Sequence, residues 1–326
     1  MIDPIRWGII ATGNIAHKLA HDIKTMPDAQ LMAVGSRSRE SADAFAQEFG
    51  IPHAYASYEE VANDPDVDVV YVATPNDLHA GNVRACIEAG KAVLCEKPFT
   101  LNAAQAKPLI ELARRKRVFL MEAMWSRFIP THRKLYDMVR TGALGEIRMI
   151  QGDFGFKAEY DPANRLFNPA RGGGALLDLG VYPIALTVRL LGAPDTISGH
   201  VTMTESGVDE QSAVVLGYKS GALAVLTSSA AVQTFNEARV FGTKGRARLE
   251  EPFWKADQLS TYIEHQEQHY VLPREDWGYQ YQLEEVHRCM RAGEIESPGM
   301  PHADTMTILT IMDTLRAQWG MKYPGE

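Results

Sequence analysis

The sequence has few cysteines, no excess of basic residues and no apolar leader. Its three cysteines, Cys86, Cys95 and Cys289, lack CxxC spacing, which argues against a disulfide framework and a structural zinc site. The formal charge of -8 offers no basic surface to nucleic acid. Residues 1–4 begin no leader, and no apolar run elsewhere approaches membrane length. We therefore expect a cytoplasmic protein with reduced thiols, no metal, no membrane contact and no nucleic-acid partner.

What the sequence does hold is the composition and rhythm of a globular α/β protein. Hydrophobic residues make up 45% and charged residues 23% of the 326 residues, and this length exceeds what one core usually organises. Early in the chain, apolar runs of strand length alternate with amphipathic stretches, as in βαβ units. The expected strands are 5–10, 30–35, a piece near 54, 67–73, 92–95 and 118–122, and the expected helices are 14–25, 38–49, 58–63, 76–89 and 102–116. This alternation predicts a doubly wound parallel sheet.

The pattern changes after residue 124, where we place a boundary between domains 1–124 and 125–326. The second part is expected to hold a helix at 129–141, a strand at 147–156, an apolar segment at 175–191 and closing helices at 279–292 and 303–318. Alternating segments with turn-rich joints between 196 and 272 predict a mostly antiparallel sheet. The predicted fold class is therefore α/β, with an N-terminal doubly wound domain and a C-terminal α/β domain built on a large open sheet.

The first strand-to-helix turn carries a candidate dinucleotide fingerprint. It reads Gly8-Ile9-Ile10-Ala11-Thr12-Gly13-Asn14-Ile15-Ala16, a GxGxxG/A pattern with Ala11 in place of the first glycine. Gly13 lets the backbone approach a pyrophosphate, Ala16 lets helix and strand pack closely, and the helix N-terminus offers N–H groups to the anion. We expect the cofactor contacts here from Ala11, Thr12, Gly13, Asn14 and Ile15. The alternative is that these small residues only ease packing.

The end of the second strand indicates which dinucleotide is bound. An NAD enzyme places a carboxylate there for the ribose 2′-hydroxyl, whereas this chain reads Gly35-Ser36-Arg37-Ser38-Arg39. Ser36 can donate a hydrogen bond to a 2′-phosphate, and Arg37 can pair with it and stack on adenine. NADP is therefore favoured as the cofactor. The alternative is that Ser38 caps the second helix and both arginines are solvated.

Further motifs resemble the glucose–fructose oxidoreductase/inositol dehydrogenase (Gfo/Idh/MocA) family over almost the whole chain. They are the fingerprint, Ala73-Thr74-Pro75-Asn76 with His79, Glu96-Lys97-Pro98, and Gly172-Gly173-Gly174 before Asp178-Leu179-Gly180. The longer stretches 121–128 and 178–183 resemble the branch that holds dimeric dihydrodiol dehydrogenase and NADP-dependent D-xylose dehydrogenase. The resemblance implies a Rossmann domain at 1–124, a substrate-binding and oligomerisation domain at 125–326, a homodimer formed through the open sheet, and a cis peptide before Pro98.

The resemblance also points to the catalytic residues. Much of the family has a histidine as proton carrier where this chain has Tyr182, so we assign the acid/base role to the phenol. A free phenol titrates near pH 10, but a nearby ammonium stabilises the phenolate, and Lys97 is the obvious candidate. Asp178 lies four residues before Tyr182 and shares its face if the segment is helical. Its role stays open between contacting a substrate hydroxyl and stabilising a helix N-terminus.

The remaining site residues fall into a cofactor group and a substrate group. Besides the fingerprint, Ser36 and Arg37, the expected cofactor contacts are Thr74, Pro75, Asn76, His79, Glu96 and Lys97. The expected substrate contacts are Trp125, Arg127, Phe154, Asp178 and Tyr182. A structural role remains the alternative for His79 and core packing for the aromatics, and Glu96 can also hold Lys97.

These residues predict an NADP-dependent dehydrogenase that transfers hydride to or from a carbinol carbon of a small-molecule sugar or diol. An aldose 1-dehydrogenase such as D-xylose dehydrogenase is preferred, because Asp161, Asn164, Arg165 and Arg171 can serve several hydroxyls. The alternative within the enzyme class is a trans-1,2-dihydrodiol dehydrogenase. The alternative of another class is a non-catalytic NADP(H)-binding sensor or regulatory protein.

Overall fold

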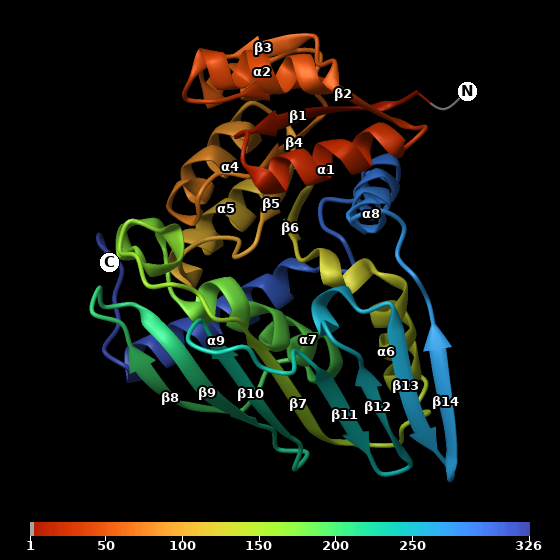
Figure 1. Ribbon diagram of the computed structural model, residues 1–326. Helices are drawn as coiled ribbons and strands as arrows, with labels where there is room; N and C mark the ends of the chain where they lie inside the picture. The colour runs from red at the N-terminus through yellow and green to blue at the C-terminus, as the bar shows by residue number, and fades with distance from the viewer. Residues whose placement is uncertain (1–2) are drawn as a thin grey trace. The chain divides into compact units, whose positions relative to one another are not determined.

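The computed structural model describes residues 3–326, so Met1 and Ile2, which entered the leader argument, lie outside the described residues. The chain divides into two units (Figure 1). The first comprises Met1–Trp125 and Glu275–Thr305, and the second comprises Ser126–Arg274 and Met306–Glu326. The segment Glu275–Thr305, expected in the second domain, packs with the first unit in the structure. The functional division into a dinucleotide domain and a substrate domain stays a prediction.

The segment Glu275–Thr305 joins the first unit through specific polar contacts of its helix α8 (Gln280–Arg291). Trp7 Nε1 donates to His287 Nε2 over 3.0 Å, and His287 Nδ1 lies 3.0 Å from Asp28 Oδ2. Since the indole can only donate, His287 is neutral at Nε2 and carries its proton on Nδ1. The sequence between these partners is too long for any local pattern to predict the pairing.

The first unit is built on a parallel sheet in the order β3-β2-β1-β4-β5-β6. Its strands are β1 (Ile5–Ile10), β2 (Ala29–Gly35), β3 (His53–Tyr55), β4 (Val69–Val72), β5 (Ala92–Glu96) and β6 (Leu120–Ala123). Its helices are α1 (Asn14–Thr25), α2 (Arg39–Phe49), α3 (Tyr58–Asn63), α4 (His79–Glu88), α5 (Ala103–Lys116) and α8. This order and these crossover helices confirm the doubly wound fold. The carboxyl ends of β1, β2, β4 and β5 therefore share one edge of the sheet.

The second unit is built on a sheet in the order β14-β13-β12-β11-β7-β10-β9-β8. Its strands are β7 (Ile147–Gly155), β8 (Thr196–Met203), β9 (Asp209–Gly217), β10 (Leu223–Ser229), β11 (Ala238–Gly242), β12 (Gly245–Leu249), β13 (Gln258–Ile263) and β14 (Gln266–Val271). All neighbours are antiparallel except β7 and β10, which confirms the mostly antiparallel sheet. Helices α6 (Pro130–Arg140) and α7 (Val181–Leu191) contact this sheet, and α9 (His302–Gln318) begins in the first unit and continues into the second.

One helical stretch, Pro169–Leu191, corrects the expectation that no apolar run approaches membrane length. It spans 23 residues with a mean hydropathy of 1.5, which is long and apolar enough to cross a membrane. Of its most apolar window, 78% is buried inside the structure, and its helix α7 contacts β7 and β10. Such burial is typical of a helix in a protein core, so the stretch is weak support for a membrane span.

Candidate active site

The fingerprint turn of the first unit leaves room for an anion at the N-terminus of α1. Gly13 is the residue before the helix, and no side chain caps the first turn. A Cβ added to Gly13 would meet no protein atom within 4 Å, so its small size answers no packing need and leaves this space to a ligand. Ala16 is fully buried, as the close packing of helix and strand requires. This turn therefore fits a dinucleotide pyrophosphate.

Ala11 stands where the fingerprint has its first glycine, and it adopts a glycine-like backbone. Its φ is +88°, in the left-handed region that costs an alanine about 1–2 kcal/mol. Its amide donates to Gly35 O over 2.9 Å, which ties this turn to the end of β2. The tight turn that the fingerprint needs is thus kept despite the substitution.

The residues after β2 have different roles: Ser38 and Arg39 make contacts within α2, whereas Arg37 is exposed. Ser38 Oγ accepts the Ser41 amide hydrogen over 3.3 Å and caps α2, and Arg39 pairs with Asp43 at 3.0 Å. Ser38 is therefore the helix cap that the alternative interpretation expected, and Arg39 is exposed and paired within its own helix. Ser36 is buried at the strand end, while Arg37 is exposed beside it. The exposed Arg37 is thus at the strand end where the sequence predicts a ligand phosphate.

His79 joins the loops that follow β4 and β5. Its Nδ1 lies 2.9 Å from Pro98 O and its Nε2 lies 2.7 Å from Thr74 O. The ring is fully buried, and burial lowers the pKa of His79. Since a neutral imidazole donates from only one nitrogen, only one of the two carbonyls accepts a hydrogen bond from the ring. This geometry fixes Thr74 relative to Pro98, and a cofactor role for His79 stays a prediction.

The Glu96-Lys97-Pro98 turn at the end of β5 contains the expected cis peptide between Lys97 and Pro98. Tyr71 Oη donates to Glu96 Oε1 over 2.5 Å, and the Lys97 amide donates to Glu96 Oε2 over 3.2 Å. Burial, and then the neighbouring carboxylate of Glu96, raise the pKa of Tyr71 well above its usual value. Tyr71 therefore stays a donor and fixes the Glu96 carboxylate, which in turn holds the backbone of Lys97.

A second buried carboxylate supports the same turn from β6. Glu122 Oε1 accepts the Phe99 amide hydrogen over 3.1 Å, and its Oε2 accepts the Thr305 hydroxyl hydrogen over 2.8 Å. Lys97, half-buried, thus belongs to a turn held by carboxylates on either side of it in the sequence. Neither Tyr71 nor Glu122 is predicted as a site residue from the sequence, because their partners follow only from the pairing of distant segments.

In the second unit, a π-helical turn (Leu176–Gly180) and helix α7 carry the predicted Asp178 and Tyr182. The segment is helical, as the shared-face argument requires, and Pro183 falls in the first turn of α7, where proline is tolerated. Both carboxylate oxygens of Asp178 lie 3.0 Å from Arg165 Nη2. Asp178 is therefore paired with a guanidinium within its own unit.

Tyr182 lies beside a pair of stacked aromatic rings. Its ring centroid is 5.6 Å from that of Phe154 and 6.3 Å from that of Trp254. Phe154 and Trp254 themselves stack face to face, 3.5 Å apart with 8° between their planes. Phe154 was expected as a substrate contact, whereas Trp254 was not. The only sequence signal for Trp254 was its place in an aromatic pair after a proline, Pro252-Phe253-Trp254.

Arg127 and Trp125, the other predicted substrate contacts, are both buried and belong to different units. Arg127 Nη2 donates to Ala185 O over 3.0 Å, so it supports α7 close to Tyr182. Trp125 packs against Tyr279, with ring centroids 4.9 Å apart. The structure thus gathers Phe154, Tyr182 and Trp254 in one unit, and the fingerprint, His79 and Lys97 in the other.

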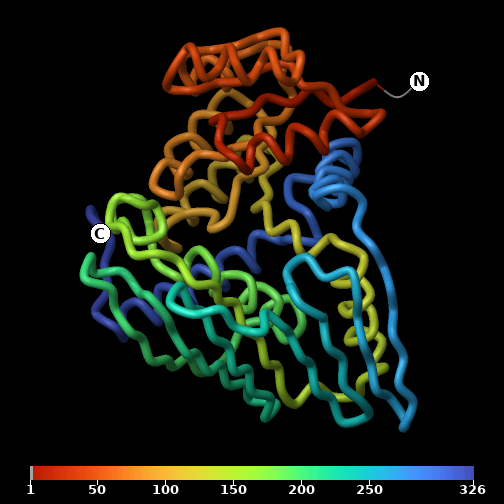
Figure 2. The backbone as a smooth tube through the Cα atoms, viewed as in Figure 1, coloured from red at the N-terminus to blue at the C-terminus, as the bar shows by residue number. Residues whose placement is uncertain are grey.

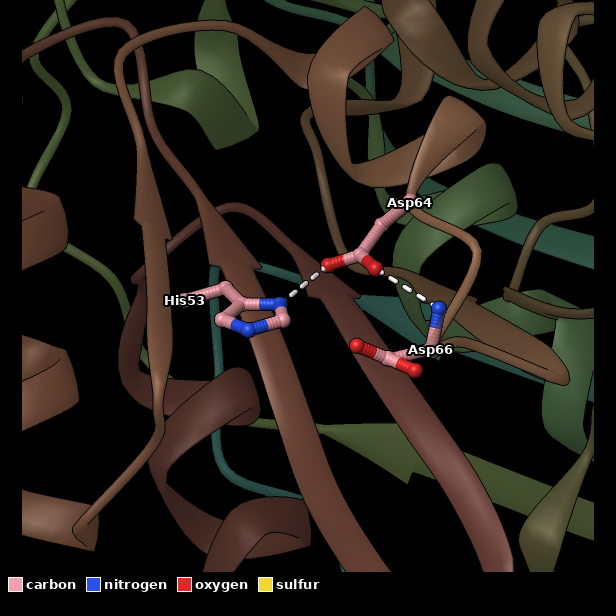
Figure 3. A group of neighbouring side chains, drawn as sticks. All are labelled: His53, Asp64 and Asp66. Carbon is pink, nitrogen blue, oxygen red and sulfur yellow. Dashed lines mark hydrogen bonds and ion pairs between the residues drawn. The ribbon is translucent and has the colours of Figure 1, made fainter.

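A separate group of His53, Asp64 and Asp66 has the residue types of a metal site (Figure 3). Its members bind one another: His53 Nδ1 lies 2.7 Å from Asp64 Oδ2, and the Asp66 amide donates to Asp64 Oδ1 over 2.8 Å. Burial opposes ionisation of Asp64, but these hydrogen bonds outweigh it and lower its pKa. Arg6 also pairs with Asp66 at 3.2 Å. The group is accounted for as a hydrogen-bonded support beneath β3.

Comparison with known proteins agrees with this fold and these motifs. Residues 5–124 match the family described as "Oxidoreductase family, NAD-binding Rossmann fold", and residues 132–248 match the "GFO/IDH/MocA C-terminal domain". The chain therefore belongs to the Gfo/Idh/MocA oxidoreductase family, and the predicted class, a nicotinamide-dependent dehydrogenase, is confirmed.

Two relatives with the same name are similar to this chain over nearly its whole length. The chain is 37% identical to the trans-1,2-dihydrobenzene-1,2-diol dehydrogenase of Mus musculus, over 99% of each chain. The Homo sapiens protein of the same name is also 37% identical over 99% of each chain.

Two solved structures share the whole fold. One is the aldose–aldose oxidoreductase of Caulobacter crescentus complexed with glycerol, with a TM-score of 0.88, 26% identity and coverage of 97% of this chain and 98% of that chain. The other is KijD10, a 3-ketoreductase from Actinomadura kijaniata in complex with NADP and TDP-benzene, with a TM-score of 0.85, 27% identity and the same coverage.

Proposed function

We propose that this protein is an NADP-dependent dehydrogenase that oxidises a carbinol carbon of a cyclic trans-1,2-diol, and that it runs the reverse reaction when the carbonyl is supplied. The observation that carries the proposal is the phenol of Tyr182 beside the stacked rings of Phe154 and Trp254. A flat, partly unsaturated ring packs well against such a surface, and a phenol there is placed to exchange a hydroxyl proton.

The diol is preferred to the aldopentose because the polar residues expected to serve sugar hydroxyls are engaged locally. Asp161 Oδ1 accepts the Ala163 amide hydrogen over 2.8 Å, and Asn164 Oδ1 accepts that of Leu166 over 3.0 Å. Arg165 is paired with Asp178. The names of the Mus musculus and Homo sapiens relatives support the same preference.

An aldose 1-dehydrogenase, such as a D-xylose dehydrogenase, is the second candidate. It is favoured by the likeness to the Caulobacter crescentus aldose–aldose oxidoreductase. Sugar rings also stack their C–H faces on aromatic side chains, so the Phe154–Trp254 pair is compatible with both substrates.

In the proposed mechanism, residues of the first unit bind the dinucleotide and residues of the second unit act on the substrate. The fingerprint turn, Thr74 and Asn76 hold the dinucleotide, and the bound nicotinamide supplies the hydride acceptor. Tyr182 takes the substrate hydroxyl proton onto its phenolate oxygen. Stabilisation of that phenolate by the ammonium of Lys97 stays the expectation from the sequence. Within the first unit, Glu96 accepts the Lys97 amide hydrogen and keeps that backbone in place. Asp178 is paired with Arg165, so its role stays open between contacting a substrate hydroxyl and supporting the helical segment that carries Tyr182.

The preference for NADP over NAD rests on Ser36 and Arg37. No carboxylate stands at the end of β2, and the exposed guanidinium of Arg37 suits a 2′-phosphate. The NADP complex of the neighbour KijD10 supports this choice.

The test is a panel of arene trans-dihydrodiols, aldopentoses, aldohexoses and inositols, each with NADP+ and with NAD+. The absorbance of the reduced nicotinamide is followed. Turnover of the dihydrodiols with NADP+, at a higher kcat/KM than any aldose, is the expected result. A higher kcat/KM for D-xylose would move the proposal to the aldose 1-dehydrogenase. Tight NADP binding without turnover of any compound would favour the sensor alternative.

We also propose that two copies of the chain associate through the face of the large sheet that α6 and α7 leave uncovered. The sheet exposes Val215, Leu223 and Val225, an apolar row on two neighbouring strands. Such a row is more typical of an interface than of a solvated surface. Light scattering on a sizing column is expected to give the mass of a dimer, and Leu223→Lys is expected to give the mass of a monomer. A wild-type monomer at high concentration would contradict the proposal.

We also propose that the protein is cytoplasmic. The three cysteines are free thiols and are buried, as suits a reducing compartment. Cell fractionation that finds the protein with a membrane or outside the cytoplasm would contradict it.

A further inference from the structure

Asp209 lies at the start of β9 and reaches the segment that carries the proposed catalytic phenol. Its Oδ2 accepts the Leu176 amide hydrogen over 2.6 Å. Leu176 is the first residue of the π-helical turn that leads into α7, and the first amides of a helix have no acceptor within the helix itself. Asp209 therefore caps the Asp178–Tyr182 segment from a strand that is 33 residues away in the sequence.

The glycine turn before this segment is shaped around the same carboxyl group. Gly174 has a φ of +112°, and a Cβ built on it would lie 2.1 Å from Asp209 Oδ1. On the other side, Tyr323 Oη donates to Gly173 O over 2.5 Å from the C-terminal end of the chain, which Figure 2 shows beside this loop. The turn is thus held by β9 and by the C-terminal segment together.

The carboxyl group of Asp209 changes its charge near neutral pH. Burial raises its pKa to about 7, and Oδ1 is buried with no hydrogen-bond partner among the described residues. Arg316 of α9 acts in the opposite direction, and the buried phenol of Tyr323 has a pKa well above its usual value, so it stays neutral. The other charged groups acting on Tyr323 are Asp178 and Glu326.

The two charge states of Asp209 differ in how well they hold the helical turn. A carboxylate accepts an amide hydrogen bond more strongly than a carboxylic acid does, and it also interacts favourably with the positive end of a helix. Protonation of Asp209 is therefore expected to weaken the cap on Leu176.

We propose that Asp209 is a positioning residue for the acid/base group: its ionised carboxylate holds the first turn of the Asp178–Tyr182 segment and so sets where the Tyr182 phenol stands. The kinetic part of this inference rests on the proposed function, since it needs a substrate. Its structural part concerns the second unit alone and can be tested without turnover.

The kinetic test compares kcat across neutral pH for the wild type, Asp209→Asn and a control, Asp195→Asn, which alters an exposed carboxylate paired with Lys219. Asparagine keeps an oxygen for the Leu176 amide but cannot ionise. The wild type and the control are expected to lose kcat by about threefold to tenfold as the pH falls through 7. Asp209→Asn is expected to stay near the low value throughout, with unchanged NADP affinity. A variant that keeps both the wild-type kcat and its acid limb would overturn the inference.

The structural test uses protein labelled with ¹³C at the tyrosine ζ carbon, with the Tyr182 signal assigned from Tyr182→Phe. In the wild type and in Asp195→Asn this signal is expected to shift with a midpoint near pH 7, and in Asp209→Asn this inflection is expected to be absent. A wild-type signal that does not move between acid and neutral pH overturns the inference, even if Asp209→Asn fails to fold. If no diol or sugar is turned over, the proposed function fails while this measurement still decides the role of Asp209.

Discussion

Phe154 and Trp254 stack face to face, with 3.5 Å between ring centroids and 8° between ring planes, and Tyr182 stands beside them. The pair offers a flat apolar surface next to a phenol, and this arrangement is compatible with the proposed binding of an arene diol. Trp254 is partly exposed while Phe154 is buried, so the tryptophan provides the accessible side of the pair.

Replacing Trp254 with alanine is expected to raise KM for a dihydrodiol by about threefold to tenfold, because aromatic stacking contributes about 0.5–1.5 kcal/mol beyond burial. The kcat is expected to change less, since the phenol of Tyr182 remains. Trp277→Ala is the matched control, because Trp277 is 47% exposed and lies under Lys18 in the other unit. Initial rates over a range of diol concentrations give both constants. Equal KM values for the two variants would remove Trp254 from the substrate surface.

Replacing Tyr71 with phenylalanine is expected to loosen the turn that carries Lys97. The change removes the hydrogen bond to the buried Glu96 carboxylate, and leaving such an acceptor short of a donor costs about 1–3 kcal/mol. Urea unfolding is expected to show that loss, and rate measurements are expected to show a higher KM for NADP and a lower kcat.

The matched control for this change is Tyr218→Phe in the second unit. Tyr218 Oη donates to Gly192 O over 3.3 Å, so the variant also loses one phenolic hydrogen bond. It is expected to leave the KM for NADP unchanged. If the two variants affect that KM equally, the Tyr71–Glu96 pair has no particular role in the cofactor site.

The cofactor preference is expected to depend on one arginine of the two at the end of β2. Arg37→Asp places a carboxylate where the 2′-phosphate of NADP is proposed to lie, and losing a charge-assisted pair costs about 1.5–3 kcal/mol. The ratio of kcat/KM for NADP to that for NAD is therefore expected to fall by about tenfold or more. Arg39→Asp is the control, since Arg39 is engaged by Asp43. An unchanged ratio in Arg37→Asp would contradict the NADP argument.

The stability of the second unit is expected to depend on pH through His132. The Nε2 atom of His132 lies 2.8 Å from the carbonyl oxygen of Phe253, the residue before Trp254. Burial lowers the pKa of His132 from 6.5 to about 4. Between pH 4 and pH 6.5, His132 is therefore protonated in the unfolded chain and neutral in the folded protein. Stability is therefore fully present above pH 6.5 and is lost as the pH falls, by up to about 3 kcal/mol.

The measurement is the free energy of unfolding in urea at several pH values for the wild type and His132→Gln. Glutamine can still donate to the carbonyl but does not titrate, so the advantage of the wild type is expected to shrink toward acid pH. Comparing the two proteins cancels the opposite contribution of Asp209, whose raised pKa favours the folded state as the pH falls. The exposed His269, changed to glutamine, serves as control. A constant difference across pH would contradict the account of His132.

Local signals predicted much of the fold, and they supplied the candidate site residues whose roles stay predictions. The fingerprint turn, the Ser38 cap and the turn at Glu96-Lys97-Pro98 each depend on residues a few positions apart. Periodicity located the helices and strands of residues 5–123, but between residues 196 and 272 it predicted only a mostly antiparallel sheet and not its individual strands. The sequence did not predict that residues 275–305 belong to the first unit, because this placement depends on contacts of α8 with β1 and α1, which are distant in the sequence.

The residues that the sequence did not reveal act through contacts between distant segments. Tyr71 meets Glu96 across 25 residues, and Asp209 meets Leu176 across 33. Trp254 becomes a site candidate only when its loop brings it onto Phe154. Conversely, Asp161 and Asn164 looked available for sugar hydroxyls, but their side chains bind backbone amides two residues on, as short polar side chains in turns commonly do.

The central claim is that the phenol of Tyr182 moves the substrate proton during hydride transfer. Its most direct test is the single-turnover rate of Tyr182→Phe with saturating NADP+ and the best diol of the panel, alongside the dissociation constant for NADPH. Loss of the phenol is expected to lower this rate by about a hundredfold or more, as is typical for loss of a general acid or base, while the dissociation constant stays within about twofold. A rate close to that of the wild type would contradict it.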